Sequence, residues 1–231
     1  MNGEPVVVVA MSVREAVADD RLARMADEVG GTVAHLQLGD PSLARELTRL
    51  ADSGATQVSV VGVSFGKLAP AASWLRRVAA HWWRARAEPR PTISVATRLA
   101  FDETELDDVL AVTRPITGTE AGLTSAAWED VPRHRHQLLV CRGPRCTALG
   151  SDTTAEAFVL AMMDRGLSDD DVLITHTGCQ FPCNRAPVVS VQPDDVWYGG
   201  VDATAAGTIV EEHLVAGRPV DSHRLPRERR H

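Results

Sequence analysis

Four cysteines are the residues of this chain best suited to chemistry, and all of them lie between residues 141 and 183. Cys141 and Cys146 are separated by four residues and Cys179 and Cys183 by three, with 32 residues between the two pairs. Each pair encloses a segment containing glycine or proline and follows a strand-like run, so we expect the thiols at loop tips. Thiolates in such loops bind iron–sulfur clusters or zinc. Structural zinc favours two-residue gaps, so the longer gaps favour a 2Fe-2S core, with zinc and thiol chemistry as the alternatives.

Composition narrows the class of protein and the setting of these thiols. The net charge is −7, which argues against nucleic acid as a partner, because phosphate binding needs a clustered basic surface. The apolar run at residues 6–10 follows no charged region and is too short to span a bilayer, so we expect a cytoplasmic protein without a membrane anchor. A reducing cytosol disfavours structural disulfides, which again indicates metal ligands or redox groups.

Residues 1–112 alternate between strand-like and helix-like patterns. The strand-like runs are rich in valine or isoleucine, and helical periodicity fills the segments between them. Repeated β-α units with short loops predict a parallel sheet covered by helices on both faces. The expected strands are residues 5–10, 32–38, 57–63 and 92–97.

The rest of the chain predicts a linker, a second α/β domain and a tail. Residues 113–135 contain scattered proline, glycine, serine and threonine, which is typical of a linker. Residues 136–220 read as β-α-β-β-β-α, with one strand ending at Cys141 and another just before Cys179. Residues 221–231 are basic and lack apolar periodicity, so we expect a disordered tail.

Residues 136–220 resemble the thioredoxin-like 2Fe-2S ferredoxins. The resemblance is carried by LLVCRGPRC at 138–146, TGCQFPCNRAPVV at 177–189, VWYGGV at 196–201 and IVEEHLVAGRPV at 209–220. It implies a 2Fe-2S cluster with Cys141, Cys146, Cys179 and Cys183 as its ligands, a redox partner protein, and a homodimer.

The first half resembles one lobe of the sirohydrochlorin and cobalt chelatases, which insert a divalent metal into a tetrapyrrole. The similar stretches are DPSLARELTRLADSGA at 40–55 and QVSVVGVSFG at 57–66. The fold class expected for the whole chain is therefore α/β, a chelatase-like parallel α/β lobe followed by a thioredoxin-like ferredoxin domain.

The residues that serve chelatase catalysis are replaced in this lobe. The family has Gly-His-Gly-Ser after its first strand, where this chain has Ala10, Met11, Ser12 and Val13. A second family histidine corresponds to Lys67, the only lysine in the chain. Thioether sulfur is a weak ligand and no base, and an ammonium group repels a divalent cation. We therefore assign no catalytic residue.

A ligand pocket is still expected at the C-terminal ends of the parallel strands, where such sheets bind ligands. Its candidate lining is Met11, Ser12, Ser64, Phe65 and Lys67. A lysine at this rim suits a tetrapyrrole carboxylate.

Three functions follow from these features. The leading one is one-electron transfer linked to tetrapyrrole metabolism, of sirohaem or cobalamin. The second is a tetrapyrrole metal chelatase that carries a 2Fe-2S cluster, against which the missing imidazoles argue. The third is a tetrapyrrole-binding redox sensor or carrier.

Overall fold

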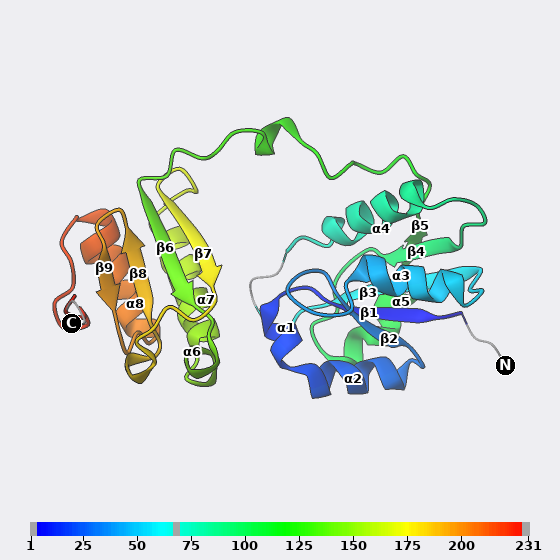
Figure 1. The fold of residues 1–231 in the computed structure, drawn as a ribbon. Coiled ribbons are helices and arrows are strands. Elements are labelled where there is room, and N and C mark those ends of the chain that lie inside the picture. Colours follow the sequence, from blue (N-terminus) through cyan, green and yellow to red (C-terminus); the bar gives the residue numbers. More distant parts are fainter. Residues whose placement is uncertain (1–3, 67–69, 228–231) are drawn as a thin grey trace. The chain divides into compact units, whose positions relative to one another are not determined.

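The computed structural model describes residues 4–66 and 70–227, and the chain divides into two compact units (Figure 1). The first unit is Met1–Trp128 and the second is Glu129–His231, and each has its own β-sheet. The protein is therefore mixed α/β with two sheets. Within the described ranges, no helix is long and apolar enough to cross a membrane.

The first unit is built on a five-stranded sheet in the order β2-β1-β3-β4-β5. The first four of these strands are parallel, as expected, and β5 runs antiparallel to β4. Continuous runs of apolar β-branched residues favour strands that are buried on both faces, and β1 and β3 are of this kind. The strands are β1 (Val6–Ala10), β2 (Thr32–His35), β3 (Gln57–Val63), β4 (Thr92–Ala96) and β5 (Thr113–Pro115).

Helices cover both faces of this sheet, and alternate residues of β1 show the division. Val7 and Val9 pack with residues of α3 and α4, whereas Val8 and Ala10 pack with residues of α2 and α5. The expectation of a parallel sheet with helices on both faces is therefore confirmed. The helical elements are α1 (Val13–Val17), α2 (Asp19–Glu28), α3 (Leu43–Asp52), α4 (Ser73–Ala85), η1 (Glu103–Glu105), α5 (Leu106–Leu110) and η2 (Ala126–Trp128).

The structure differs from the expected linker at residues 113–122, which belong to the first unit. Arg76 of α4 donates to the carbonyl oxygens of two β5 residues and to the Glu120 carboxylate at 2.8 Å. Arg84 donates to the carbonyl oxygens of Gly118 and Glu120. The segment has no apolar periodicity of its own, because its order comes from hydrogen bonds to arginines of another element.

The second unit has a four-stranded sheet in the order β7-β6-β8-β9, with helices on one face (Figure 1). Strands β6 and β7 are parallel, and β8 is antiparallel to both β6 and β9. Its elements are β6 (His136–Cys141), α6 (Pro144–Ala148), α7 (Ser151–Asp164), β7 (Val172–Thr177), η3 (Cys183–Arg185), β8 (Val189–Gln192), β9 (Val196–Tyr198), α8 (Ala203–Ile209) and a π-helical turn, η4 (Val210–Val215).

One face of this second sheet forms the core of the unit. Leu138 and Val140 of β6 pack with Phe158 of α7 and Ile209 of α8, all of them fully buried. The strand-helix order agrees with the β-α-β-β-β-α pattern of the sequence, apart from the short additional helix α6 between β6 and α7.

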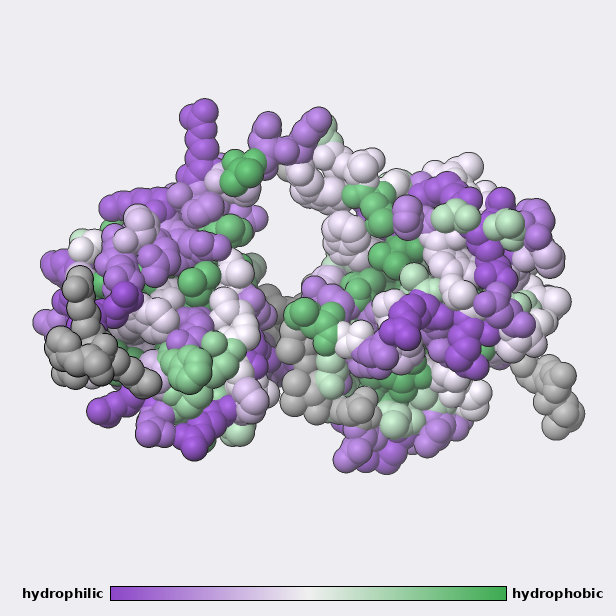
Figure 2. Space-filling view, viewed as in Figure 1, coloured by the Kyte–Doolittle hydropathy of each residue, from purple (hydrophilic) through white to green (hydrophobic). Residues whose placement is uncertain are grey.

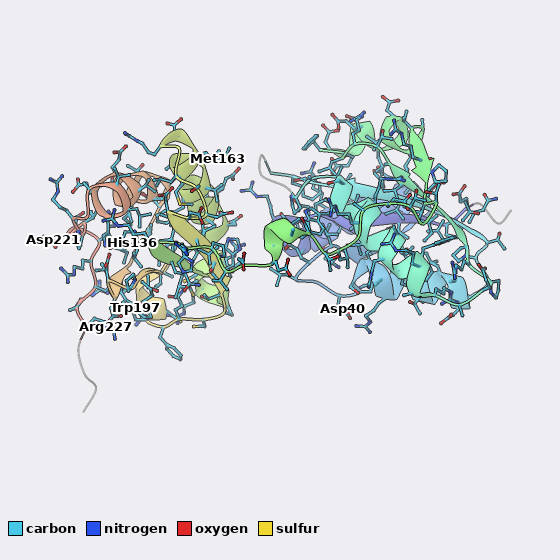
Figure 3. The ribbon with its side chains drawn as sticks, turned by 90° about the horizontal axis from the view of Figure 1, so that it is seen from above. Asp40, His136, Met163, Trp197, Asp221 and Arg227 are labelled. Carbon is cyan, nitrogen blue, oxygen red and sulfur yellow. The ribbon has the colours of Figure 1, made fainter. Side chains whose placement is uncertain are left out.

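The described part of the tail, residues 221–227, lies along β9, which differs from the expectation of disorder. The N–H of Gly199 donates to the His223 carbonyl at 2.9 Å, and the N–H of Leu225 donates to the Trp197 carbonyl at 2.7 Å. Arg227 lies over the Trp197 ring (Figure 3). Pairing with an open sheet edge orders this segment despite its polar sequence.

Candidate metal centre

The four cysteines lie at one end of the second sheet because of how its strands are paired. Strands β6 and β7 are parallel and Cys141 is in register with Thr177, so both strands end at the same edge. Cys141 is the last residue of β6 and Cys146 lies in α6. Cys179 follows β7 by two residues, and Cys183 begins η3. The strand pairing thus brings two pairs that are distant in sequence to neighbouring loops.

The two loops lie against each other at the thiols. The Sγ atoms of Cys179 and Cys183 are 3.3 Å apart, and Cys141 Sγ contacts the second loop, since it donates to the Gly178 carbonyl at 3.5 Å and accepts from the Gln180 N–H at 3.4 Å. All four are free thiols. Cys141 and Cys146 are buried, Cys183 is half-buried and Cys179 is exposed. Four cysteines at one sheet edge supply the soft donors that bind a polynuclear cluster or a single metal ion.

The four thiols have different surroundings, and these shift their pKa values in different directions. Burial raises the pKa of Cys146 to about 11, with the neighbouring Cys141 adding to the effect. The backbone N–H of Phe181 lowers the pKa of Cys179, and the Cys183 side chain lowers it further. In return, the adjacent Cys179 raises the pKa of Cys183. Cys179 is therefore the thiol of its pair that ionises first, and thiolate is the form that binds metal.

Gly143 allows the two loops to approach each other. A Cβ atom at this position would lie 2.9 Å from both the Cα and the Cβ of Cys179. Real Cβ atoms do not come so close to backbone, so only glycine fits here without moving a loop.

Gln180 ties the second loop to the open face of the sheet. Its Nε2 donates to the Leu139 carbonyl at 3.1 Å and to Thr177 Oγ1 at 2.8 Å. Its Oε1 accepts from Ser190 Oγ at 3.1 Å, and its backbone N–H donates to Cys141 Sγ at 3.4 Å. The cysteine spacing gave no signal for this role, because Ser190 lies on a later strand.

The four thiols do not form a closed metal site by themselves. Among the residues that the structure describes, no group of three or more His, Cys, Asp or Glu side chains, cysteines included, is already arranged to hold a metal ion. Trp197 packs against the buried pair Cys141 and Cys146, together with Val188.

A second polar cluster lies at the β8–β9 turn, away from the thiols. Asp194 Oδ2 accepts from Nε2 of His213 at 2.9 Å and from Nε2 of His136 at 3.2 Å. The Nδ1 of His213 is then free to accept from the Tyr198 hydroxyl at 2.8 Å, and this hydroxyl accepts from the Val220 N–H at 3.1 Å. Burial lowers the pKa of His213, although Asp194 opposes the shift. His213 is thus held neutral inside the unit.

The candidate pocket residues of the first unit lie at the C-terminal ends of β1 and β3, as the sequence placed them. Met11 and Ser64 are fully buried, and Ser12 and Phe65 are half-buried. Lys67 lies outside the described residues. A surface cavity of about 530 Å³ lies at the opposite edge of the sheet and is lined by Glu4, Pro5 and residues 53–57.

Glu15 is a buried carboxylate at these strand ends that the sequence analysis did not single out. Its Oε2 accepts from both the N–H and the hydroxyl of Ser12 at 2.7 Å, and its Oε1 accepts from the Phe65 N–H at 2.7 Å. Glu15 therefore ties the loop after β1 to the loop after β3. The Ser-x-x-Glu pattern of a helix capping box was the available signal.

Known proteins resemble part of this chain. No protein-family model matches it. A 2Fe-2S ferredoxin of Clostridium pasteurianum is 34% identical over 94 residues, which are 37% of this chain and 91% of the relative. A 2Fe-2S ferredoxin of Aquifex aeolicus (strain VF5) is 40% identical over 76 residues, 33% of this chain and 68% of the relative. The crystal structure of a thioredoxin-like [2Fe-2S] ferredoxin from Aquifex aeolicus is 35% identical, covers 40% of this chain and 97% of that one, and has a TM-score of 0.37.

Proposed function

Because the chain belongs, over 37% of its length, to the 2Fe-2S ferredoxin family, we propose that its second unit binds a 2Fe-2S cluster and transfers single electrons to or from a redox partner. The cluster, when bound, supplies a centre that gains and loses one electron at a time. The chain supplies its ligands, its burial and the surface that a partner approaches.

The ligands in this proposal are Cys141, Cys146, Cys179 and Cys183. The observation that carries the assignment is that the two cysteine loops lie against each other at one sheet edge, where Cys141 Sγ contacts Gly178 and Gln180 on either side of Cys179. The buried pair fixes one side of the site in the unit's interior, and the pair at the surface leaves the other side accessible. Electron transfer to a partner needs such an accessible side.

Metal analysis and spectroscopy of the as-isolated protein test this function. Anaerobically purified protein should be red-brown, contain about two irons and two sulfides per chain, and give a paramagnetic signal on dithionite reduction. Cys141→Ala and Cys179→Ala should each lose or destabilise the cluster, whereas Ala148→Ser, an exposed position in α6, should keep it. A colourless protein with one zinc per chain would contradict the proposal, and wild-type spectra in both cysteine variants would contradict the ligand set.

We further propose that the first unit links this electron transfer to tetrapyrrole metabolism, of sirohaem or cobalamin. The support is the sheet order β2-β1-β3-β4, in which the connections from β1 and β3 leave in opposite directions. Parallel sheets of this order bind ligands beyond the C-terminal ends of the strands at that point. Met11, Ser12, Ser64 and Phe65 follow β1 and β3 there.

An absorbance titration with sirohydrochlorin, with and without a divalent metal, tests the link. Saturable spectral shifts would support the link. The absence of binding under both conditions would contradict it and would favour a role of the first unit in docking or assembly. Metal insertion above the uncatalysed rate would favour the chelatase alternative instead. Homodimer formation is a separate prediction, which sedimentation velocity tests.

A further inference from the structure

The loops that carry the cysteines are positively charged, although the protein as a whole is acidic. Residues 142–150 and 177–188 contain Arg142, Arg145 and Arg185 and no aspartate or glutamate, whereas the chain has a net charge of −7. Charges close to a site dominate its field once salt screens the more distant ones. Apart from the charge of the cluster and its thiolates, a partner that approaches these loops therefore meets positive side chains and no carboxylates.

Arg145 and Arg185 are exposed and held in place by groups that do not cancel their charge. Arg145 Nη1 donates to Asn184 Oδ1 at 2.5 Å and so joins the two loops. The Arg185 carbonyl accepts from the Gly200 N–H at 2.7 Å, which fixes its backbone. In the part of the chain that the structure describes, no ion pair includes either of the two guanidinium groups.

Three arginines elsewhere on the same unit form ion pairs with carboxylates. These pairs are Arg165 with Glu211, Arg224 with Asp221 and Arg227 with Asp195. The unit therefore has carboxylates beside some of its arginines but none on the cysteine loops. Exposed guanidinium groups that form no ion pair within the chain are suited to bind carboxylates of another molecule.

An exposed aromatic residue lies between the two surface thiols. Phe181 is 68% exposed, and its backbone has a φ of +49°. A bulky residue rarely adopts this left-handed conformation, and such strain concentrates at functional sites. Figure 2 shows hydrophobic residues among hydrophilic ones at the end of this unit where α6 lies.

We propose that the face formed by Arg145, Phe181 and Arg185 docks the redox partner protein through an acidic surface that also offers an apolar contact. This inference rests on the proposed function, because the docked partner exchanges its electron with the cluster beside this face. The two arginines guide an acidic surface to the site, and Phe181 adds apolar area that leaves water when the partner binds.

Stopped-flow oxidation of the reduced, cluster-loaded protein measures the local charge with two inorganic probes. Tris(oxalato)cobaltate(III) is an anion and hexaamminecobalt(III) is a cation, and each accepts one electron from the protein to give cobalt(II). The rate with the anion should fall as ionic strength rises from about 0.01 M to about 0.3 M, and the rate with the cation should rise. Net charge alone predicts the opposite for both probes.

Reversing the charge of Arg145 and Arg185 should invert the salt dependence of the rates with the two cobalt probes. The double variant Arg145→Glu/Arg185→Glu should lower the anion-to-cation rate ratio by about tenfold or more at low salt. The double variant Arg133→Glu/Arg218→Glu makes the same change in net charge at exposed positions outside the cysteine loops and should keep the wild-type salt dependence. Equal effects of both double variants would overturn the proposal.

Acidic polypeptides test the protein-docking part. Poly-L-glutamate should slow oxidation by the anion at low salt, and a random copolymer of glutamate and tyrosine should slow it more. Phe181→Ser should remove the advantage of the copolymer and leave the poly-L-glutamate effect in place. No slowing by either polymer would overturn the docking face. Iron content and the spectrum of the reduced protein are recorded for each variant, so failure of the cluster assignment is seen separately from failure of docking.

Discussion

Gln180 offers the sharpest single test of how this chain holds its thiol loops. The side chain makes three hydrogen bonds to the open face of the sheet, at Leu139, Thr177 and Ser190, and the backbone N–H donates to Cys141 Sγ. Replacing Gln180 with leucine keeps a similar volume and removes all three side-chain bonds. The perturbation therefore releases the loop without deleting any thiol.

The structure sets the magnitude of the expected loss. A typical hydrogen bond contributes about 0.5–1.5 kcal/mol net, so three bonds correspond to roughly 1.5–4.5 kcal/mol. Ser190 is fully buried and would lose the acceptor of its hydroxyl, which places the cost toward the upper part of that range. We expect Gln180→Leu to lose its cluster to a chelator at least tenfold faster than the wild type, because about 1.4 kcal/mol corresponds to a factor of ten.

The reduction potential gives a second readout that general destabilisation would not move. A hydrogen bond to a ligand sulfur stabilises the reduced, more negative state, so loosening the Gln180 N–H should lower the potential. If the hydrogen bond stabilises the reduced cluster relative to the oxidised one by about 0.5–1 kcal/mol, its loss lowers the potential by roughly 20–40 mV for one electron. Gln180→Glu should lower the potential further, because it also places a negative charge near Cys141.

A matched control lies on the same sheet. Gln137 of β6 donates to Thr175 Oγ1 at 3.2 Å, so Gln137→Leu removes a comparable side-chain bond that does not involve a cysteine loop. Its potential should equal that of the wild type in protein-film voltammetry. If Gln180→Leu also keeps the wild-type potential and the wild-type rate of cluster loss, Gln180 has no role in positioning Cys141.

Two further predictions concern a close approach and a buried histidine. Gly143→Ala should displace the Cys179 backbone and lower iron content per chain, whereas Gly178→Ala, with no neighbouring atom within 4 Å of its Cβ, should leave iron content unchanged. His213 has a lowered pKa in the folded protein, so the unfolded chain takes up a proton first as pH falls through 6.5, and stability is lost from there down to the folded pKa. The free energy of unfolding should fall by at most about 1.4 kcal/mol per pH unit from this group. Denaturant titrations should show a smaller pH dependence in His213→Gln, and an undiminished one in His134→Gln.

The parts of the fold that the sequence predicted are those where a local pattern and the global structure agree. Buried valine runs predicted the parallel strands of the first unit, because a strand covered on both faces needs apolar residues at every position. The cysteines could be assigned to one site because their residue type and loop placement leave few alternative chemistries.

The missed features depend on contacts between distant elements. Gln180 acts through Ser190, and Arg76 orders residues 114–120 from a different helix. No periodicity within either segment records such partners. The tail at residues 221–231 was expected to be disordered, because the order of residues 223–225 comes from hydrogen bonds to β9 and the residue after it and not from a pattern in the tail itself. The tetrapyrrole ligand and the homodimer stay predictions.

Glu15 sets a condition on any ligand of the first unit. Its buried carboxylate already binds the N–H groups of Ser12 and Phe65, which are the donors that an anionic ligand group would use at these strand ends. A tetrapyrrole carboxylate would have to displace Glu15 and would be repelled by it at short range. A ligand that brings a cation to the same place would instead pair with the carboxylate. The metal-dependent arm of the sirohydrochlorin titration is therefore the one in which the structure leads us to expect binding.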